Sequence, residues 1–179
     1  MQWYVEMKDL KRAIPQMGIL LAVAVLAGYI EMIIPADLLI PGVKLGLANS
    51  VILFILYRAG FKASLIISIL RTVIIAFLFT SPSVLLYSFS AAVVSLIVMT
   101  LLRKSGLFSI YGISAAGGIV HNMTQLIIAG VIMLGIGAGF ERIIFFYLPI
   151  LIISGLAAGL FNAFIADILI KRIPVKEDI

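Results

Sequence analysis

The sequence contains no cysteine and few charged residues, and both shortages exclude classes of protein. Without cysteine the chain has no disulfide, no thiolate zinc site and no cysteine nucleophile. Charged residues make up 12% of the 179 residues and hydrophobic residues 64%, whereas a soluble domain has about a quarter and about half. A domain of this size leaves much of its chain at the surface, so the apolar excess cannot be hidden in a core. The composition predicts an integral membrane protein and excludes a water-soluble enzyme.

Several catalytic signatures are also missing. The chain has no Gly-x-x-x-x-Gly-Lys-[Ser/Thr] loop to cradle ATP phosphates, and no Asp-Asp-x-x-Asp cluster to hold magnesium against a prenyl diphosphate. His121 is the only histidine, so it cannot complete a three-histidine metal site, and no carboxylate at a useful spacing orients it as a base. We therefore predict that the chain is not itself an enzyme, and we expect no metal and no cofactor.

Long hydrophobic runs dominate what is present. About 20 apolar residues cross a bilayer core about 30 Å thick as a helix, and the runs lack the two-residue alternation of a barrel. Six runs fit this description, at residues 14–34, 45–57, 61–80, 84–102, 110–134 and 143–170. The sequence therefore predicts an all-α membrane protein, a six-transmembrane-helix bundle that forms a single domain over residues 1–179.

Lysine and arginine are distributed unevenly between the two sides of such a bundle. One side receives ten of them, which are Lys8, Lys11, Arg12, Arg58, Lys62, Arg103, Lys104, Lys171, Arg172 and Lys176. The other side receives Lys44 and Arg142, and Arg71 lies within a span. This bias predicts a multi-pass protein of the cytoplasmic membrane with both termini in the cytoplasm. Because the basic residues lie in small groups between apolar runs, the net charge of +5 does not indicate nucleic-acid binding.

Polar residues at membrane depth are the candidate site. Arg71 lies near the middle of the third span, where an ionisable group is costly and is a functional candidate by default. The polar side chains of the fifth span are Ser114, His121, Asn122, Thr124 and Gln125. Ser114, His121 and Gln125 share one helical face by their spacing. Ligand contact and hydrogen bonding between helices are both consistent with this group.

Further candidates lie toward the outer side of the predicted bundle. Lys44 and Asn49 follow a Pro-Gly turn, and Lys44 either anchors the helix end at the lipid headgroups or attracts a ligand. Tyr87 supplies either an aromatic wall or an interfacial anchor. Glu31 has three possible basic partners, Lys44, Arg71 and Arg142. The sequence predicts a ligand that is anionic or rich in carbonyl groups.

Small residues four apart mark two faces for close helix packing. Ala24 and Gly28 form one such pair in the first span, and Gly155 and Gly159 form another in the sixth. Such pairs let another helix approach closely. Either face serves contacts within the bundle or docking of another membrane subunit.

Three segments together resemble a known bacterial family. They are Pro41-Gly-Val-Lys-Leu-Gly-Leu-Ala-Asn49, Arg71-Thr72, and the segment from Phe108 to Leu126 that contains His121-Asn-Met-Thr-Gln125. These residues resemble the Gx transporter family, many members of which are labelled heptaprenyl diphosphate synthase component I. That family is similar to the substrate-capture (S) components of energy-coupling-factor (ECF) transporters, which are six-helix proteins for vitamins and other micronutrients.

The resemblance implies a function and a set of partners. The chain would bind a small molecule through Lys44, Asn49, Arg71, Tyr87, His121, Asn122 and Gln125. It would work with a transmembrane coupling subunit and two ATP-binding subunits, with Ala24 and Gly28 facing the coupling subunit. Two other functions stay open: an accessory membrane subunit of isoprenoid or quinone synthesis, and a membrane subunit of flavin- or quinone-linked electron transfer.

Overall fold

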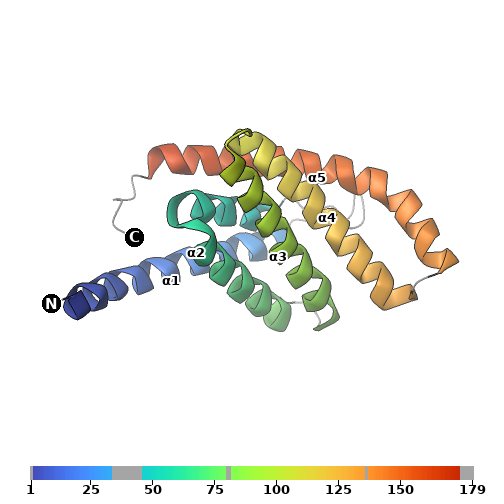
Figure 1. Ribbon diagram of the computed structural model, residues 1–179. Helices are drawn as coiled ribbons and strands as arrows, with labels where there is room; N and C mark the ends of the chain where they lie inside the picture. The colour runs from blue at the N-terminus through green and yellow to red at the C-terminus, as the bar shows by residue number, and fades with distance from the viewer. Residues whose placement is uncertain (1, 34–45, 80–81, 136, 174–179) are drawn as a thin grey trace.

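The computed structural model describes residues 2–33, 46–79, 82–135 and 137–173, and these residues form helices without any strand. The five helices are α1 (Gln2–Ile33), α2 (Leu47–Phe79), α3 (Pro82–Ser105), α4 (Ile110–Leu134) and α5 (Ala138–Arg172) (Figure 1). Each contains a stretch long and apolar enough to cross a membrane. The described part of the chain is therefore all-helical, and its apolar helices indicate a multi-pass membrane protein, as the composition predicts.

Helix α2 contains two of the six predicted spans, and it folds back on itself at Gly60. Gly60 has φ 80° and ψ −174°, a backbone conformation that glycine adopts without steric cost. Asn49 and Arg71 lie eleven residues before and after it, yet Arg71 Nη2 donates to Asn49 Oδ1 at 3.4 Å. In a straight helix these residues would be about 33 Å apart. We call residues 47–59 the first arm and residues 61–79 the second arm (Figure 1).

The first arm lies at the centre of the bundle. Every residue from Val51 to Leu56 is buried, so this helix is covered on all sides. The core around it draws on every other helix, through Ala24 of α1, Leu96 and Met99 of α3, Ile113 of α4, and Ala163 and Ala166 of α5. This position explains the short apolar run of 13 residues predicted at residues 45–57. The run forms a helix that is surrounded by the other helices of the bundle.

Two arginines tie three helix ends together at the Gly60 turn. Arg103, at the end of α3, donates from Nη2 to the Tyr57 carbonyl at 3.2 Å, and its guanidinium lies 4.7 Å from the centre of the Tyr57 ring. Arg58 donates from Nη2 to the carbonyl of Ile173, just past the end of α5, at 2.9 Å. Carbonyls in the last turn of a helix have no partner within it, so these arginines satisfy them. We call this side of the bundle the turn end.

We expect replacement of Arg103 by alanine to destabilise the turn end. The variant loses the hydrogen bonds to the carbonyls of Leu56 and Tyr57 and the contact with the Tyr57 ring. The expected loss in the free energy of unfolding is about 2 kcal/mol, measured by denaturant titration in detergent micelles. Lys104→Ala is the matched control, because Lys104 is exposed on the same turn of α3. An equal loss in both variants would contradict the assignment.

Small residues bring helix backbones into contact at two crossings. A Cβ atom added to Gly155 would lie 2.7 Å from the Gly118 carbonyl oxygen, so α4 and α5 touch through their backbones. The predicted packing face at Gly155 and Gly159 is therefore a contact inside the chain. On α1, Ala24 is fully buried, and a Cβ on Gly28 would lie 3.3 Å from Ile75 of the second arm. The predicted packing face at Ala24 and Gly28 is therefore covered by α2. Docking of a coupling subunit on this face would require α1 to separate from α2.

Candidate functional site

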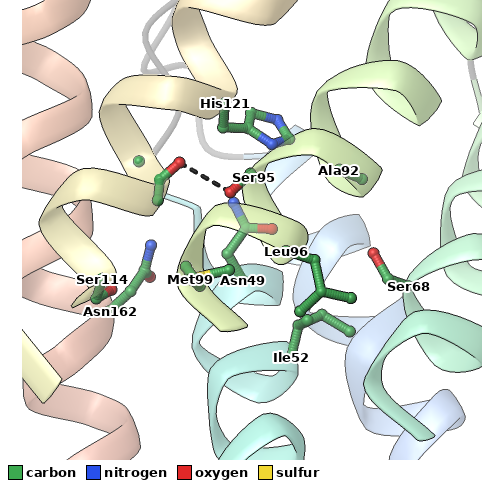
Figure 2. A pocket seen from close by; sticks show the side chains of 12 residues that line it. Asn49, Ile52, Ser68, Ala92, Ser95, Leu96, Met99, Ser114, His121 and Asn162 are labelled. Carbon is green, nitrogen blue, oxygen red and sulfur yellow. Dashed lines mark hydrogen bonds between the residues drawn. The ribbon is translucent and has the colours of Figure 1, made fainter. Parts of the chain in front are cut away.

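A small cavity lies between α2, α3, α4 and α5. Its lining residues are Asn49, Ile52, Ser68, Ala92, Ser95, Leu96, Met99, Ser114, Gly117, Gly118, His121 and Asn162 (Figure 2). Six of these twelve side chains are polar, in a bundle whose other interior residues are mostly apolar. The cavity volume is about 20 Å³, which suffices for about one water molecule. Polar groups from four helices thus converge on one small interior space.

The contact between α3 and α4 shapes one wall of this cavity. Ser95 Oγ donates to the Gly117 carbonyl oxygen at 2.8 Å (Figure 2). A Cβ on Gly117 would lie 2.5 Å from Met99 Sδ, so a larger residue there would displace the Met99 side chain. Hydroxyl-to-backbone bonds and small residues are the usual means by which membrane helices pack. His121, one turn further along α4, lines the same cavity.

The opposite wall is built where α2 begins. Gly46 has φ 74°, which favours glycine, and the Asn49 N–H donates to its carbonyl at 2.7 Å to start the helix. The Gly46 N–H donates to Oε1 of Glu31, near the end of α1. A Cβ at Gly46 would lie 2.6 Å from Asn162 Nδ2, so the missing side chain leaves room for the Asn162 amide. The start of α2 therefore positions Asn49 and Asn162 together.

Asn162 carries a polar atom that lacks a partner. The residue is 4% exposed, and its Oδ1 is buried without a hydrogen bond among the described residues. Leaving a buried acceptor unpaired costs about 1–3 kcal/mol, and such groups are rare in folded proteins. Because Asn162 lines the cavity, this atom marks the place where a hydrogen-bond donor would be stabilised.

Arg71 joins the site through Asn49 and does not line the cavity. Its Nη2 donates to Asn49 Oδ1 at 3.4 Å, and its Nε is buried without a partner among the described residues. The carboxylate of Glu31 acts electrostatically on this guanidinium. Of the three basic partners considered for Glu31, Arg71 is therefore one on which its charge acts.

The other predicted site residues have different places. His121 lines the cavity, whereas Asn122 Nδ2 donates to the Leu151 carbonyl at 3.0 Å and to Ser154 Oγ at 3.2 Å, both on α5. Gln125 Nε2 donates to Ser88 Oγ of α3 at 3.1 Å. In the structure Asn122 and Gln125 connect α4 to its neighbours, outside the cavity lining. Tyr87 is half-buried and also outside the lining, and Lys44 lies outside the described residues.

Sequence reasoning did not include Asn162, Ser68 and Ser95 among the site residues. Ser68 and Ser95 are each one of several hydroxyl residues in their spans, and such residues usually bond to the backbone of a helix, as Ser95 does. Asn162 carried a usable signal, since it is the only carboxamide of the sixth predicted span. Its contact with Gly46 depends on the fold of α2, which the sequence did not disclose.

We expect Gly46→Ala to disturb the site more than Gly60→Ala. Both glycines have positive φ, so alanine is strained at either position by about 1–2 kcal/mol. At Gly60 nothing lies within 4 Å of the added Cβ, whereas at Gly46 it meets Asn162 Nδ2 at 2.6 Å. The expected result is a larger drop in the midpoint of thermal unfolding for Gly46→Ala. Equal drops in the two variants would show that backbone strain alone acts and that Asn162 is not held at this place.

One of three comparisons with known proteins found a match. A family model described as heptaprenyl diphosphate synthase component I matches residues 20–169, which include the end of α1, all of α2 to α4 and most of α5. A search of curated proteins and a search of solved structures found no match. The match extends over most of the chain and contains every residue that lines the cavity. The chain therefore belongs to the heptaprenyl diphosphate synthase component I family.

Proposed function

We propose that this chain is the substrate-binding membrane component of an ECF-type importer and that it holds a small polar molecule in the cavity between α2 and α5. The observation that carries the proposal is the convergence of Asn49, His121 and Asn162 on one cavity, with a buried acceptor of Asn162 unpaired. Binding sites for small molecules combine apolar walls with a few convergent polar groups of this kind.

The depth of the cavity supports a transport role. Ser95 and Asn162 each lie ten residues before the end of their helix at the turn end, and His121 lies eleven residues after the start of α4. Asn49 and Arg71 lie eleven residues from Gly60. These spacings correspond to about 15 Å along a helix, half of a hydrocarbon core about 30 Å thick. A site near the bilayer midplane is typical of transporters.

The proposal includes six passages through the membrane and an orientation. The two arms of α2 run in opposite directions, so that with α1, α3, α4 and α5 the chain makes six passes. The described basic residues at the turn end are Arg58, Lys62, Arg103, Lys104, Lys171 and Arg172, while Arg142 lies at the other end. By the positive-inside rule the turn end and both termini are cytoplasmic. The cavity then loads from outside the cell.

The size of the cavity means that loading requires movement. A ligand of vitamin size needs about 300 Å³ or more, while this cavity has about 20 Å³. The described structure is therefore a closed state, and a larger ligand enters only when the helices around the cavity separate. The start of α2 at Gly46, held by Glu31 and packed against Asn162, is the contact that must open.

Uptake in this proposal depends on partner proteins. The chain has no loop for ATP phosphates, so a transmembrane coupling subunit and two ATP-binding subunits supply the work. The test is purification of the full-length protein from its own membranes in mild detergent, followed by identification of the subunits that travel with it. Copurifying ATP-binding subunits support the role, and substrate uptake by the chain alone in liposomes would contradict it.

The family match favours a second candidate function, an accessory membrane subunit of heptaprenyl diphosphate synthesis. Because the chain has no Asp-Asp-x-x-Asp cluster, it would support a separate catalytic chain. This function predicts that extracts lacking the protein lose prenyl-chain synthesis and regain it when the purified protein is added back. Unchanged synthesis in such extracts would exclude it.

A further inference from the structure

We propose that the cavity prefers an uncharged ligand whose polar group pairs an N–H or O–H donor with a neighbouring carbonyl acceptor, as an amide or a lactam does. This proposal rests on the proposed function and narrows its ligand class. Of the two ligand classes that the sequence predicts, it selects the carbonyl-rich one over the anionic one. Three features of the described site lead to it.

The first feature is the lack of acidic and basic side chains, apart from His121, among the described residues of the lining. Apart from His121, the polar lining residues are two carboxamides and three hydroxyls, namely Asn49, Asn162, Ser68, Ser95 and Ser114. Neither a carboxylate nor a lysine or arginine is among the twelve lining residues. A charged ligand loses its hydration on entering such a cavity, and without an opposite charge this loss is not compensated.

The second feature is the position of Arg71, a cation that contacts the lining residue Asn49 and does not itself line the cavity. Its guanidinium contacts the Asn49 side chain and experiences the charge of Glu31. Arginine and carboxylate together carry no net charge, so they do not attract an anion over a neutral molecule. Arg71 instead orients Asn49, because its bond to Oδ1 turns the Nδ2 donor of that amide away from the guanidinium.

The third feature is the complementary pair of Asn49 and Asn162. Asn162 offers an unpaired, buried Oδ1 acceptor, and Asn49 offers an Nδ2 donor, both at the cavity wall (Figure 2). An acceptor and a donor on the wall of one cavity match an amide, which carries the same two functions in reverse. A carboxylate has acceptors only, so it leaves Asn162 Oδ1 unpaired and places negative charge against it.

Three small probe molecules, tested on the wild-type protein, distinguish an amide ligand from a ligand that only accepts hydrogen bonds and from an anion. Acetamide donates and accepts, N,N-dimethylacetamide accepts without donating, and acetate accepts and is charged. Each is titrated against the purified full-length protein in detergent at neutral pH, with the midpoint of thermal unfolding as the readout, because a ligand of the folded state raises this midpoint. We expect the apparent affinity for acetamide to exceed the other two by about tenfold.

A variant ties the preference to the proposed atom. Asn162→Ala removes the acceptor, so acetamide should then bind no better than N,N-dimethylacetamide. Acetate binding as tightly as acetamide to the wild-type protein overturns this proposal and leaves the binding role intact. If none of the three probes raises the midpoint, both the ligand class and the binding role of the cavity are overturned.

Discussion

Replacing Gly159 by leucine is expected to leave no folded protein in the membrane, and Gly159→Ala to lower the free energy of unfolding by about 2–3 kcal/mol. A Cβ at Gly159 would lie 2.5 Å from the Ser114 carbonyl oxygen and 2.7 Å from the Ala115 Cα. Both neighbours are backbone atoms of α4, which cannot rotate away as a side chain can. The helices α4 and α5 must therefore separate, and this also moves Ser114 at the cavity wall.

The measurement is a denaturant titration in mixed micelles, with Gly18→Ala as the matched control. Gly18 lies within α1 and has nothing within 4 Å of an added Cβ. Alanine there is expected to be neutral or to stabilise the helix by up to about 1 kcal/mol. A Gly159→Ala protein as stable as the control would show that α4 and α5 do not pack in the described way.

Arg71→Met is expected to destabilise the protein by about 3 kcal/mol, although methionine is more apolar than arginine. The change leaves the Glu31 carboxylate, near the end of α1, without the cation that acts on it. Both residues are half-buried, and removing the positive charge leaves the negative charge partly desolvated and uncompensated. Asn49 also loses its hydrogen bond from Arg71 Nη2 and with it a fixed orientation in the cavity.

A second substitution isolates the charge. Glu31→Gln keeps an oxygen that accepts from the Gly46 N–H but removes the negative charge. The double variant should therefore be more stable than Arg71→Met alone, which a double-mutant cycle measures. Arg142→Met, at an exposed position of α5, serves as the control and should change little. A double variant less stable than Arg71→Met would refute the pairing of Glu31 with Arg71.

Composition and apolar runs were sufficient to predict the helices. The runs at residues 84–102 and 110–134 correspond to α3 and α4. A segment of about 20 apolar residues in lipid forms a helix because a helix satisfies its backbone hydrogen bonds internally. The sequence predicts two separate spans at residues 45–57 and 61–80. In the structure these spans form one element, α2, whose helix is broken at Gly60. A single glycine between two apolar runs does not reveal from the sequence how sharply the chain turns.

The site was predicted less completely than the helices, for a physical reason. Helical spacing places Ser114, His121 and Gln125 on one face, but a face covers more than one neighbour along its length. His121 therefore meets the cavity while Gln125 meets Ser88 of α3. Asn162 enters the site only because Gly46 leaves space for it. Contacts of this kind depend on how distant helices pack, which one sequence does not state.

The central claim is that the convergent polar groups of α2 to α5 form a binding site for a small molecule. Native mass spectrometry of the gently purified protein tests it most directly, with the wild-type chain and Asn162→Ala measured side by side. The account predicts a small uncharged molecule that travels with the wild-type protein and is lost from the variant. A wild-type protein that carries no small molecule, or a ligand retained equally by a folded Asn162→Ala variant, would contradict it.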